Sequence, residues 1–177
     1  NSILKGLKKC DDNDLIILSD VDEIPDLNKL KIFDKNNYAV FSQKMFMYKL
    51  NLQNLDESNW IGSKIVKKKN LKTMQKLRNL KFKEYPFWRL DKKNLQVIKG
   101  GWHFSFLQKP EDIINKIKSY SHGEFNKPEL VSRELIEEKI KSGKDIFNRG
   151  NKLISIKVDE SFPKYILNNK QKYKEWI

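Results

Sequence analysis

Three acidic residues lie within four positions of the chain, directly after a short apolar run. Asp20, Asp22 and Glu23 follow Leu15–Leu18 in the sequence LIILSDVDEIP. Because alternate residues of an extended chain point the same way, we expect the Asp20 and Asp22 carboxylates to converge while Val21 turns into the core. Two carboxylates held together repel unless a cation, a proton or a basic group lies between them. Hard oxygen ligands of this kind favour Mg²⁺ or Mn²⁺, which often bridge to phosphates.

The acidic run has other interpretations. Acidic residues are common at helix starts, so Asp26 could cap a following helix while Glu23 is a solvated loop residue. A phosphatase of the haloacid-dehalogenase type also begins with an apolar strand and Asp-x-Asp, but it requires Gly and Thr where this chain has Glu23 and Ile24. An EF-hand calcium loop is broken by Ile24 and Pro25. The remaining interpretation is the Asp-x-Asp of a nucleotide-sugar glycosyltransferase, in which a metal neutralises the diphosphate leaving group.

The chain has two histidines, and both have neighbours that suggest chemistry. His103 lies in GGWHFSF, at the end of an expected strand, although a histidine beside aromatic residues is more often part of a core. His122 lies in SYSHGEFN, two residues before Glu124. A His-x-Glu pair in a loop serves in acid/base chemistry or caps a turn.

Composition limits the partners. The net charge is +13, but only four of the 36 basic residues are arginine, and the lysines are scattered along the chain. Specific base recognition depends heavily on arginine, so this pattern disfavours nucleic acid. The densest basic stretch, 64–83, is either a solvated face or a surface that attracts a polyanionic substrate or an acidic membrane. Cys10 is the single cysteine, which excludes an intrachain disulfide and a cysteine-based metal site.

The spacing of apolar residues predicts the elements that must hold these side chains. The run 14–19 suits a strand buried on both faces, and Pro110 and Pro128 suit the first turns of two helices. Gly143 is placed to end the second helix, and the glycine pair in 95–106 predicts a bulge or a close backbone approach. Further strands are predicted at 38–50, 60–66 and 153–158, and further helices at 2–9, 26–33, 70–80 and 163–177. Strands that alternate with helices, without a linker or repeat, predict one α/β domain over 1–177.

Four blocks, in this order, resemble glycosyltransferase family 17: DLIILSDVDEIP, GGWHFSF, KIKSYSHGEFN and FPKYILNN. The likeness spans nearly the whole chain and is loose between residues 51 and 95. It implies a GT-A-like fold, with a mixed sheet flanked by helices, and inverting transfer of GlcNAc from UDP-GlcNAc with Mn²⁺ or Mg²⁺. In such folds the first part of the sheet precedes Asp-x-Asp and binds the nucleotide. Only 19 residues precede Asp20 here, so we expect part of that half to be missing.

The resemblance also implies roles for single residues. Asp22 and His103 are the implied metal ligands, and Asp20 contacts the metal or the donor ribose. Trp102 offers its ring face to a sugar or packs in the core, and with His103 it could instead form a wall of the acceptor site. Basic side chains would balance the diphosphate charge. The expected donor-binding residues are Asp20, Trp102, Arg89 and Lys64.

Inversion by single displacement requires a base that takes the proton of the acceptor hydroxyl. Glu124 is the preferred candidate, with His122 orienting it or contacting phosphate. Glu23, beside the metal site, is the alternative base, and Glu111 is a third.

Two functions follow from these patterns. The first is a metal-dependent glycosyltransferase with a nucleotide-sugar donor and a glycan acceptor. The second is a non-catalytic basic module that binds nucleic acid or anionic glycans. Acids at a strand end favour the first, because a polyanion binder has no use for them. We therefore expect no nucleic-acid partner, allow for peripheral membrane contact, and expect a cytoplasmic or membrane-associated location.

Overall fold

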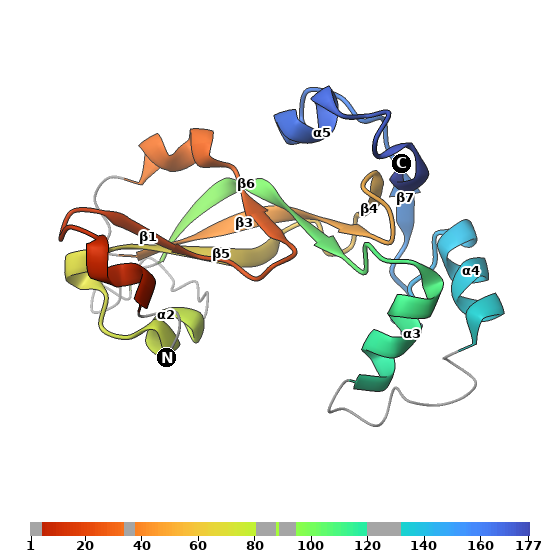
Figure 1. Cartoon of the computed structure of the whole chain (residues 1–177), viewed down its shortest axis with the longest axis horizontal. Helices are drawn as coiled ribbons and strands as arrows, with labels where there is room; N and C mark the ends of the chain where they lie inside the picture. Colours follow the sequence, from red (N-terminus) through yellow and green to blue (C-terminus); the bar gives the residue numbers. More distant parts are fainter. Residues whose placement is uncertain (1–4, 34–37, 81–87, 89–94, 120–131) are drawn as a thin grey trace. The chain divides into compact units, whose positions relative to one another are not determined.

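The computed structural model describes residues 5–33, 38–80, 88, 95–119 and 132–177, and these form a mixed α/β architecture (Figure 1). The chain divides into two compact units, each built from separate stretches of sequence. The first unit comprises Asn1–Gln43 and Asn59–His103, and the second comprises Lys44–Ser58 and Phe104–Ile177. Strands β3 (Tyr38–Met47) and β6 (Gln96–Ser105) each contribute residues to both units. The GT-A-like arrangement and the single catalytic domain stay predictions.

Antiparallel strand pairs form the framework of the first unit. Strand β1 (Leu15–Leu18) pairs with β5 (Trp60–Lys67), which pairs in turn with β3. Strand β2 (Glu23–Pro25) pairs with β6, so that Glu23 lies opposite His103 and Pro25 lies opposite Gly101. The short helices of this unit are η1 (Leu7–Lys9), η2 (Leu27–Ile32), η3 (Lys68–Asn70) and α2 (Met74–Arg78).

The predicted strand at 14–19 exists, but it is not buried on both faces. Strand β1 lies at one end of the order β1-β5-β3-β4-β7, and Leu15 is 39% exposed whereas Ile16 is buried. An apolar run of four residues fits an edge strand as well as a central one, because periodicity cannot separate the two. The buried core beside it contains Ile65, Val66, Phe41, Ala39 and Leu77.

Local sequence signals explain where several helices begin and end. The Asp26 carboxylate accepts a hydrogen bond from the Asn28 backbone N–H at 3.1 Å and so caps η2, which confirms a helix there as a short 3-10 helix. Helix α4 (Arg133–Ser142) is capped by Ser132, and Gly143 ends it in the left-handed conformation at φ 64°, as predicted. The start predicted at Pro128 lies outside the described residues.

The second unit packs helices against a short strand pair. Strand β4 (Leu52–Asn54) pairs with β3 and with β7 (Leu153–Ser155). Helices α3 (Pro110–Ser119) and α4 place Ile113, Ile117 and Ile136 in the core. The predicted helical tail is present as α5 (Lys164–Asn168) and η6 (Lys174–Trp176). Among the described residues, none of the helices has the length and apolar character needed to cross a bilayer.

An ion pair with a buried carboxylate stabilises the second unit. The Asp145 side chain is 1% exposed and accepts hydrogen bonds from Arg149 Nε at 2.8 Å and from the Arg149 backbone N–H at 3.0 Å. Burial alone would raise the pKa of Asp145, but these hydrogen bonds and the Arg149 charge outweigh it and lower the pKa below 3.8. Next to this pair, Tyr48 donates to the Lys144 carbonyl at 3.1 Å and accepts from the Ile146 N–H at 2.8 Å.

A side chain at Gly101 would meet the main chain of a neighbouring strand. Its φ is 116°, and a Cβ there would lie 2.6 Å from the Ile24 carbonyl oxygen. We predict that Gly101→Ala lowers the free energy of unfolding by about 2 kcal/mol or more, because the clash is with backbone and the conformation disfavours alanine. Gly6→Ala is the matched control, since nothing lies within 4 Å of a Cβ there. Equal losses in urea denaturation would contradict the close approach.

The lowered pKa of Asp145 predicts how stability depends on pH. A group whose pKa is lower in the folded state stabilises the fold above its unfolded pKa, and this contribution is lost as pH falls through the folded value. Unfolding free energies of the wild type should therefore decline below about pH 4 more steeply than those of Asp145→Asn. At neutral pH the variant should be about 2 kcal/mol less stable, whereas exposed Asp12→Asn should change neither quantity. Parallel pH profiles would refute the assignment.

Candidate active site

The acidic run forms a turn and not an extended strand end. The Glu23 backbone N–H donates to the Asp20 carbonyl at 3.1 Å, and Val21 between them is fully exposed. The expectation that Val21 enters the core is therefore wrong, because the chain reverses before it can continue the period of β1. The two aspartates face different partners: Asp20 Oδ1 lies 3.2 Å from Arg78 Nη2, and Asp22 Oδ2 lies 3.4 Å from His103 Nε2.

His103 is buried at the centre of this site. Its side chain is 7% exposed, and the Trp60 ring lies against it with ring centroids 4.5 Å apart. Nε2 faces Asp22, while Nδ1 is buried and has no hydrogen-bond partner among the described residues. A separation of 3.4 Å is long for an N–H···O hydrogen bond. The His103–Asp22 pair thus brings an imidazole nitrogen and a carboxylate oxygen together with little mutual bonding.

Glu23 is held by a buried polar cluster that sequence inspection did not identify. Trp60 Nε1 donates to Glu23 Oε1 at 2.9 Å, and Ser63 Oγ donates to Oε2 at 3.3 Å. Ser63 in turn accepts from Gln43 Nε2 at 3.0 Å and from Ser19 Oγ at 2.7 Å. Gln43 Oε1 is buried without a partner in the described part of the chain. The carboxylate of Glu23 is therefore held by two side chains of β5, and one of these, Ser63, is bonded in turn to Gln43 of β3.

A pocket of about 250 Å³ opens beside the acidic turn. Asp20 and Glu23 line it together with two cations, Lys64 and Arg78. Lys64 was predicted as a donor-binding residue, and the structure places it beside both acids. Arg78 was not predicted. The remaining lining residues are Leu18, Ser19, Gly62 and Asn79.

Strand β5 contributes Gly62 and Lys64 to the lining of this pocket. Its register with β3 shifts between Lys64 and Ile61, which interrupts the alternation, and both Trp60 and Ser63 reach Glu23. Gly62 is required there, because a Cβ would lie 2.1 Å from Gln43 Oε1 and 2.8 Å from Glu23 Oε1. A glycine inside an expected strand indicates a bulge or a close approach, and Gly62 was the signal in the sequence that could have located the site on β5.

The other predicted residues are placed less directly. Trp102 is half-buried opposite Ile24, and as the neighbour of His103 in a strand it points to the other face of the sheet. Glu111 lies in the first turn of α3, in the second unit, where its carboxylate is 2.8 Å from Arg133 Nη1. Three further predicted residues lie outside the described part of the chain: Arg89, His122 and Glu124.

The described residues contain no group of three or more His, Cys, Asp or Glu side chains arranged to hold a metal. The predicted triad of Asp20, Asp22 and His103 is reduced to its last two members here, because Asp20 is directed at Arg78. Mg²⁺ usually retains several waters and binds substrate phosphates, so it needs few protein ligands.

The fold and the candidate site together define the class of this protein. It is a mixed α/β protein with an acidic turn, a buried histidine and a pocket that contains both acids and cations. The family model of glycosyltransferase family 17 matches residues 1–176, so the chain belongs to glycosyltransferase family 17. Membership of this family indicates glycosyl transfer. No curated protein and no solved structure matches the chain.

Ser63 connects the polar cluster, and its removal tests the network. Ser63→Ala should cost about 2 kcal/mol in the free energy of unfolding, because it leaves Gln43, Ser19 and Glu23 without a shared buried partner. Ser19→Ala removes only one of these bonds, so it should cost about 1 kcal/mol or less. Thermal unfolding monitored by circular dichroism checks both values. If Ser19→Ala were the more damaging change, Ser63 would not be the centre of the cluster.

Proposed function

We propose that the chain is a metal-dependent inverting glycosyltransferase that transfers GlcNAc from UDP-GlcNAc to a hydroxyl group of a glycan acceptor. The observation that carries the proposal is the Asp22–His103 pair, 3.4 Å apart, next to a pocket with two cations. Membership of glycosyltransferase family 17 supports the reaction class. Family membership does not determine the sugar donor, the metal ion or the stereochemistry of transfer, and these parts are our proposal.

The separation of Asp22 and His103 supports a divalent cation shared by these two residues. Two donor atoms that are each about 2.1 Å from one ion lie about 3.0–3.5 Å apart at octahedral to tetrahedral angles, and the Asp22–His103 distance falls in this range. A mixed nitrogen and oxygen ligand set suits Mn²⁺ better than Mg²⁺. When bound, the ion would neutralise charge on the diphosphate leaving group.

Lys64 and Arg78 are the residues that would contact the diphosphate directly. Both line the pocket, and in the described part of the chain Arg78 pairs there with Asp20, in an exposed pair with side chains 62% and 64% exposed. Exposed ion pairs contribute about 0–1 kcal/mol. Arg78 can therefore exchange Asp20 for a phosphate at little cost, and this exchange would free Asp20 for the donor ribose or the ion.

The reaction needs one base. The acceptor oxygen bonds to C1 of GlcNAc while the bond from C1 to the diphosphate oxygen breaks, and the base receives the acceptor proton. Both oxygens of Glu23 already accept hydrogen bonds, from Trp60 and Ser63, which supports a positioning role for Glu23. Glu124, oriented by His122, remains the proposed base, and Glu111 is disfavoured because Arg133 engages it.

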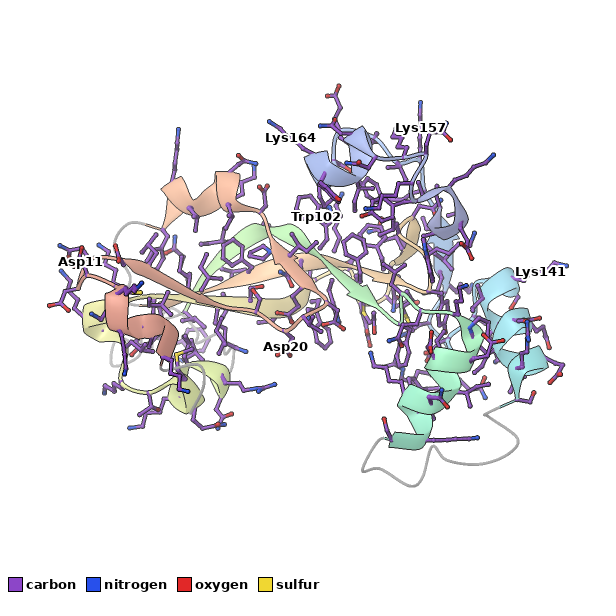
Figure 2. All side chains as sticks on the ribbon, viewed as in Figure 1. Asp11, Asp20, Trp102, Lys141, Lys157 and Lys164 are labelled. Carbon is purple, nitrogen blue, oxygen red and sulfur yellow. The ribbon has the colours of Figure 1, made fainter. Side chains whose placement is uncertain are left out.

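The alternative function is a basic binding module without catalysis. In the second unit the labelled lysines Lys141, Lys157 and Lys164 project from different elements (Figure 2). The pocket at the acidic turn is lined by acids as well as by cations. A site for a polyanion alone would not place carboxylates among its cations, so the observations favour the transferase.

Two substitutions test the metal site by binding and by turnover. Asp22→Asn and His103→Gln should each weaken Mn²⁺ binding about tenfold or more, measured by electron paramagnetic resonance, because each removes one proposed ligand. UDP release from UDP-GlcNAc in the presence of Mn²⁺ should fall at least as much. Asp12→Asn, an exposed carboxylate in the same unit, is the control and should behave as the wild type.

The product and the nucleotide provide further readouts. UDP with Mn²⁺ should shift the indole N–H signal of Trp60 in the NMR spectrum, since this N–H contacts Glu23. Proton NMR of the product should show a β-linked GlcNAc, as inversion at C1 requires. Unchanged Mn²⁺ binding in both variants would refute the metal site, and an α-linked product would refute the inverting mechanism.

A further inference from the structure

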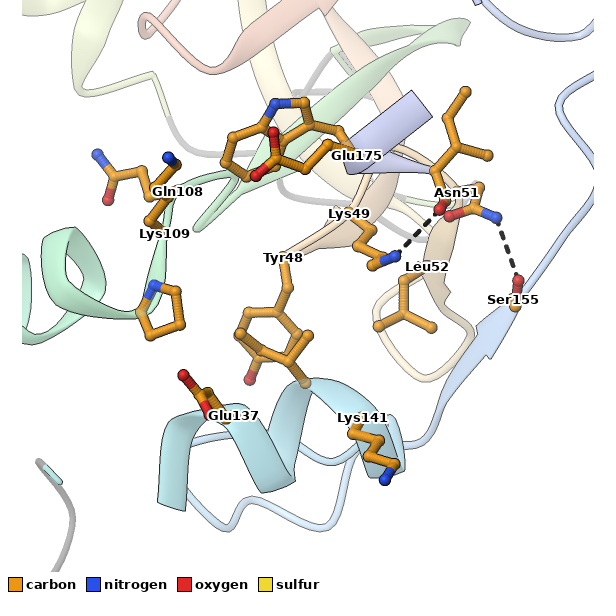
Figure 3. A pocket seen from close by; sticks show the side chains of 14 residues that line it. Tyr48, Lys49, Asn51, Leu52, Gln108, Lys109, Glu137, Lys141, Ser155 and Glu175 are labelled. Atoms are coloured by element: carbon orange, nitrogen blue, oxygen red, sulfur yellow. Dashed lines mark hydrogen bonds between the residues drawn. The ribbon is translucent and has the colours of Figure 1, made fainter. Parts of the chain in front are cut away.

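The second unit contains a larger pocket that the acidic site does not use. Its volume is about 590 Å³, within the range of pockets that hold small molecules. Figure 3 shows Gln108 and Lys109 on one side, Glu175 on another, and Glu137 and Lys141 on α4 below. Every residue that lines this pocket belongs to the second unit.

The floor of the pocket is rigid and neutral. Tyr48 is 1% exposed, and its hydroxyl group is occupied by Lys144 and Ile146. Burial, more than any other effect, raises the pKa of Tyr48 well above 10.0, so the ring is uncharged at physiological pH. Leu52 and Ile140 extend this apolar surface. The floor therefore offers hydrocarbon, and the polar groups lie around it.

Asn51 presents a fixed hydrogen-bond acceptor at the wall. Its Nδ2 donates to Ser155 Oγ at 3.1 Å (Figure 3) and to the Ile156 carbonyl at 3.2 Å. Both amide donors are thereby used, and Oδ1 is left oriented as an acceptor. A preoriented amide of this kind recognises a hydroxyl group without the entropy cost of ordering a mobile side chain.

Trp176 is held at the pocket by its main chain. The Trp176 carbonyl accepts from the Leu50 N–H at 2.7 Å, and the Ile177 carbonyl accepts from Lys49 Nζ at 3.0 Å. These bonds do not involve the indole ring, which lines the pocket as an apolar face with one N–H donor. Removal of the ring should therefore leave the segment in place.

The charges around the pocket are mixed. Three lysines (Lys49, Lys109, Lys141) and two glutamates (Glu137, Glu175) line it, and Glu137 is paired with Arg133 at 2.7 Å. In a chain with net charge +13, a pocket for a polyanion would be expected to have cations alone. Carboxylates, amides and an aromatic face around an apolar floor suit a neutral ligand with hydroxyl groups on its edges and hydrocarbon on its faces.

We propose that this pocket binds a short neutral oligosaccharide, with one pyranose ring against Trp176 and hydroxyl groups paired with Asn51, Gln108 and Glu175. The further assignment of this sugar as part of the glycan acceptor rests on the proposed function. Sugar binding itself does not depend on it, because the pocket and the Asp22–His103 site share no residue.

The test is an NMR titration of the full chain with N,N′-diacetylchitobiose, mannobiose and lactose. The indole N–H signal of Trp176, identified by its absence in Trp176→Phe, should shift with at least one disaccharide at a dissociation constant of about 1 mM. Trp176→Ala should weaken this binding at least tenfold in saturation-transfer measurements. Tyr165→Ala, which removes an exposed ring of the same unit outside the pocket, should leave it unchanged.

A second, more conservative variant keeps the proposal testable if Trp176→Ala fails to fold. Glu175→Gln removes one charge from an exposed residue and should weaken binding about threefold to tenfold with an unaltered NMR spectrum. No shift of the Trp176 signal with any of the three disaccharides would overturn the proposal, and so would equal binding by Trp176→Ala. If UDP with Mn²⁺ still shifts the Trp60 indole N–H signal in that case, the failed sugar-binding proposal leaves the proposed glycosyl transfer standing. A Trp176 response without a Trp60 response would support the sugar site and remove its acceptor role.

Discussion

The close approach of Gly101 to the main chain of β2 is the constraint on which the candidate site depends. Because a Cβ at this position would meet the Ile24 carbonyl, only glycine allows β2 to pair with β6 in the observed register. That register places Glu23 opposite His103, and the turn that precedes β2 then carries Asp22 to the imidazole. A backbone contact that involves no functional group therefore determines which functional groups meet.

Signals that act over a few residues allowed correct predictions, and contacts between distant segments did not. Asp26 and Gly143 act through their own turns, so the helix boundaries beside them could be read from the sequence. The turn at Val21 could not be read from the sequence, because an apolar run followed by acidic residues is compatible with an extended chain or with a chain reversal. Arg78 was missed since its partner, Asp20, is 58 residues away. The register of β2 with β6 is likewise a property of tertiary packing.

The buried polar atoms of the site argue for function over stability. Gln43 Oε1 and His103 Nδ1 are both buried and lack partners among the described residues, and each such group costs about 1–3 kcal/mol. Apolar side chains of similar shape would remove that cost. Buried polar atoms without hydrogen-bond partners are typical of sites whose hydrogen bonds are completed only when a ligand is present. Two of the four such atoms in the described part of the chain lie at Gln43 and His103, where the chemistry is proposed, and the other two belong to Glu57 and Asn151 in the second unit.

Under the proposed function, the acidic turn and the basic composition would act at different steps of donor binding. A net charge of +13 spread over the chain produces a long-range potential that raises the encounter rate with an anionic donor but does not select among anions. Selection requires short-range contacts, and Asp20 and Asp22 would repel a free diphosphate. With a cation beside Asp22 the repulsion becomes attraction, so only an anion that arrives with a metal ion gains from both effects. Under the proposed function, the acidic turn in this lysine-rich chain would favour metal-bound diphosphates over other polyanions.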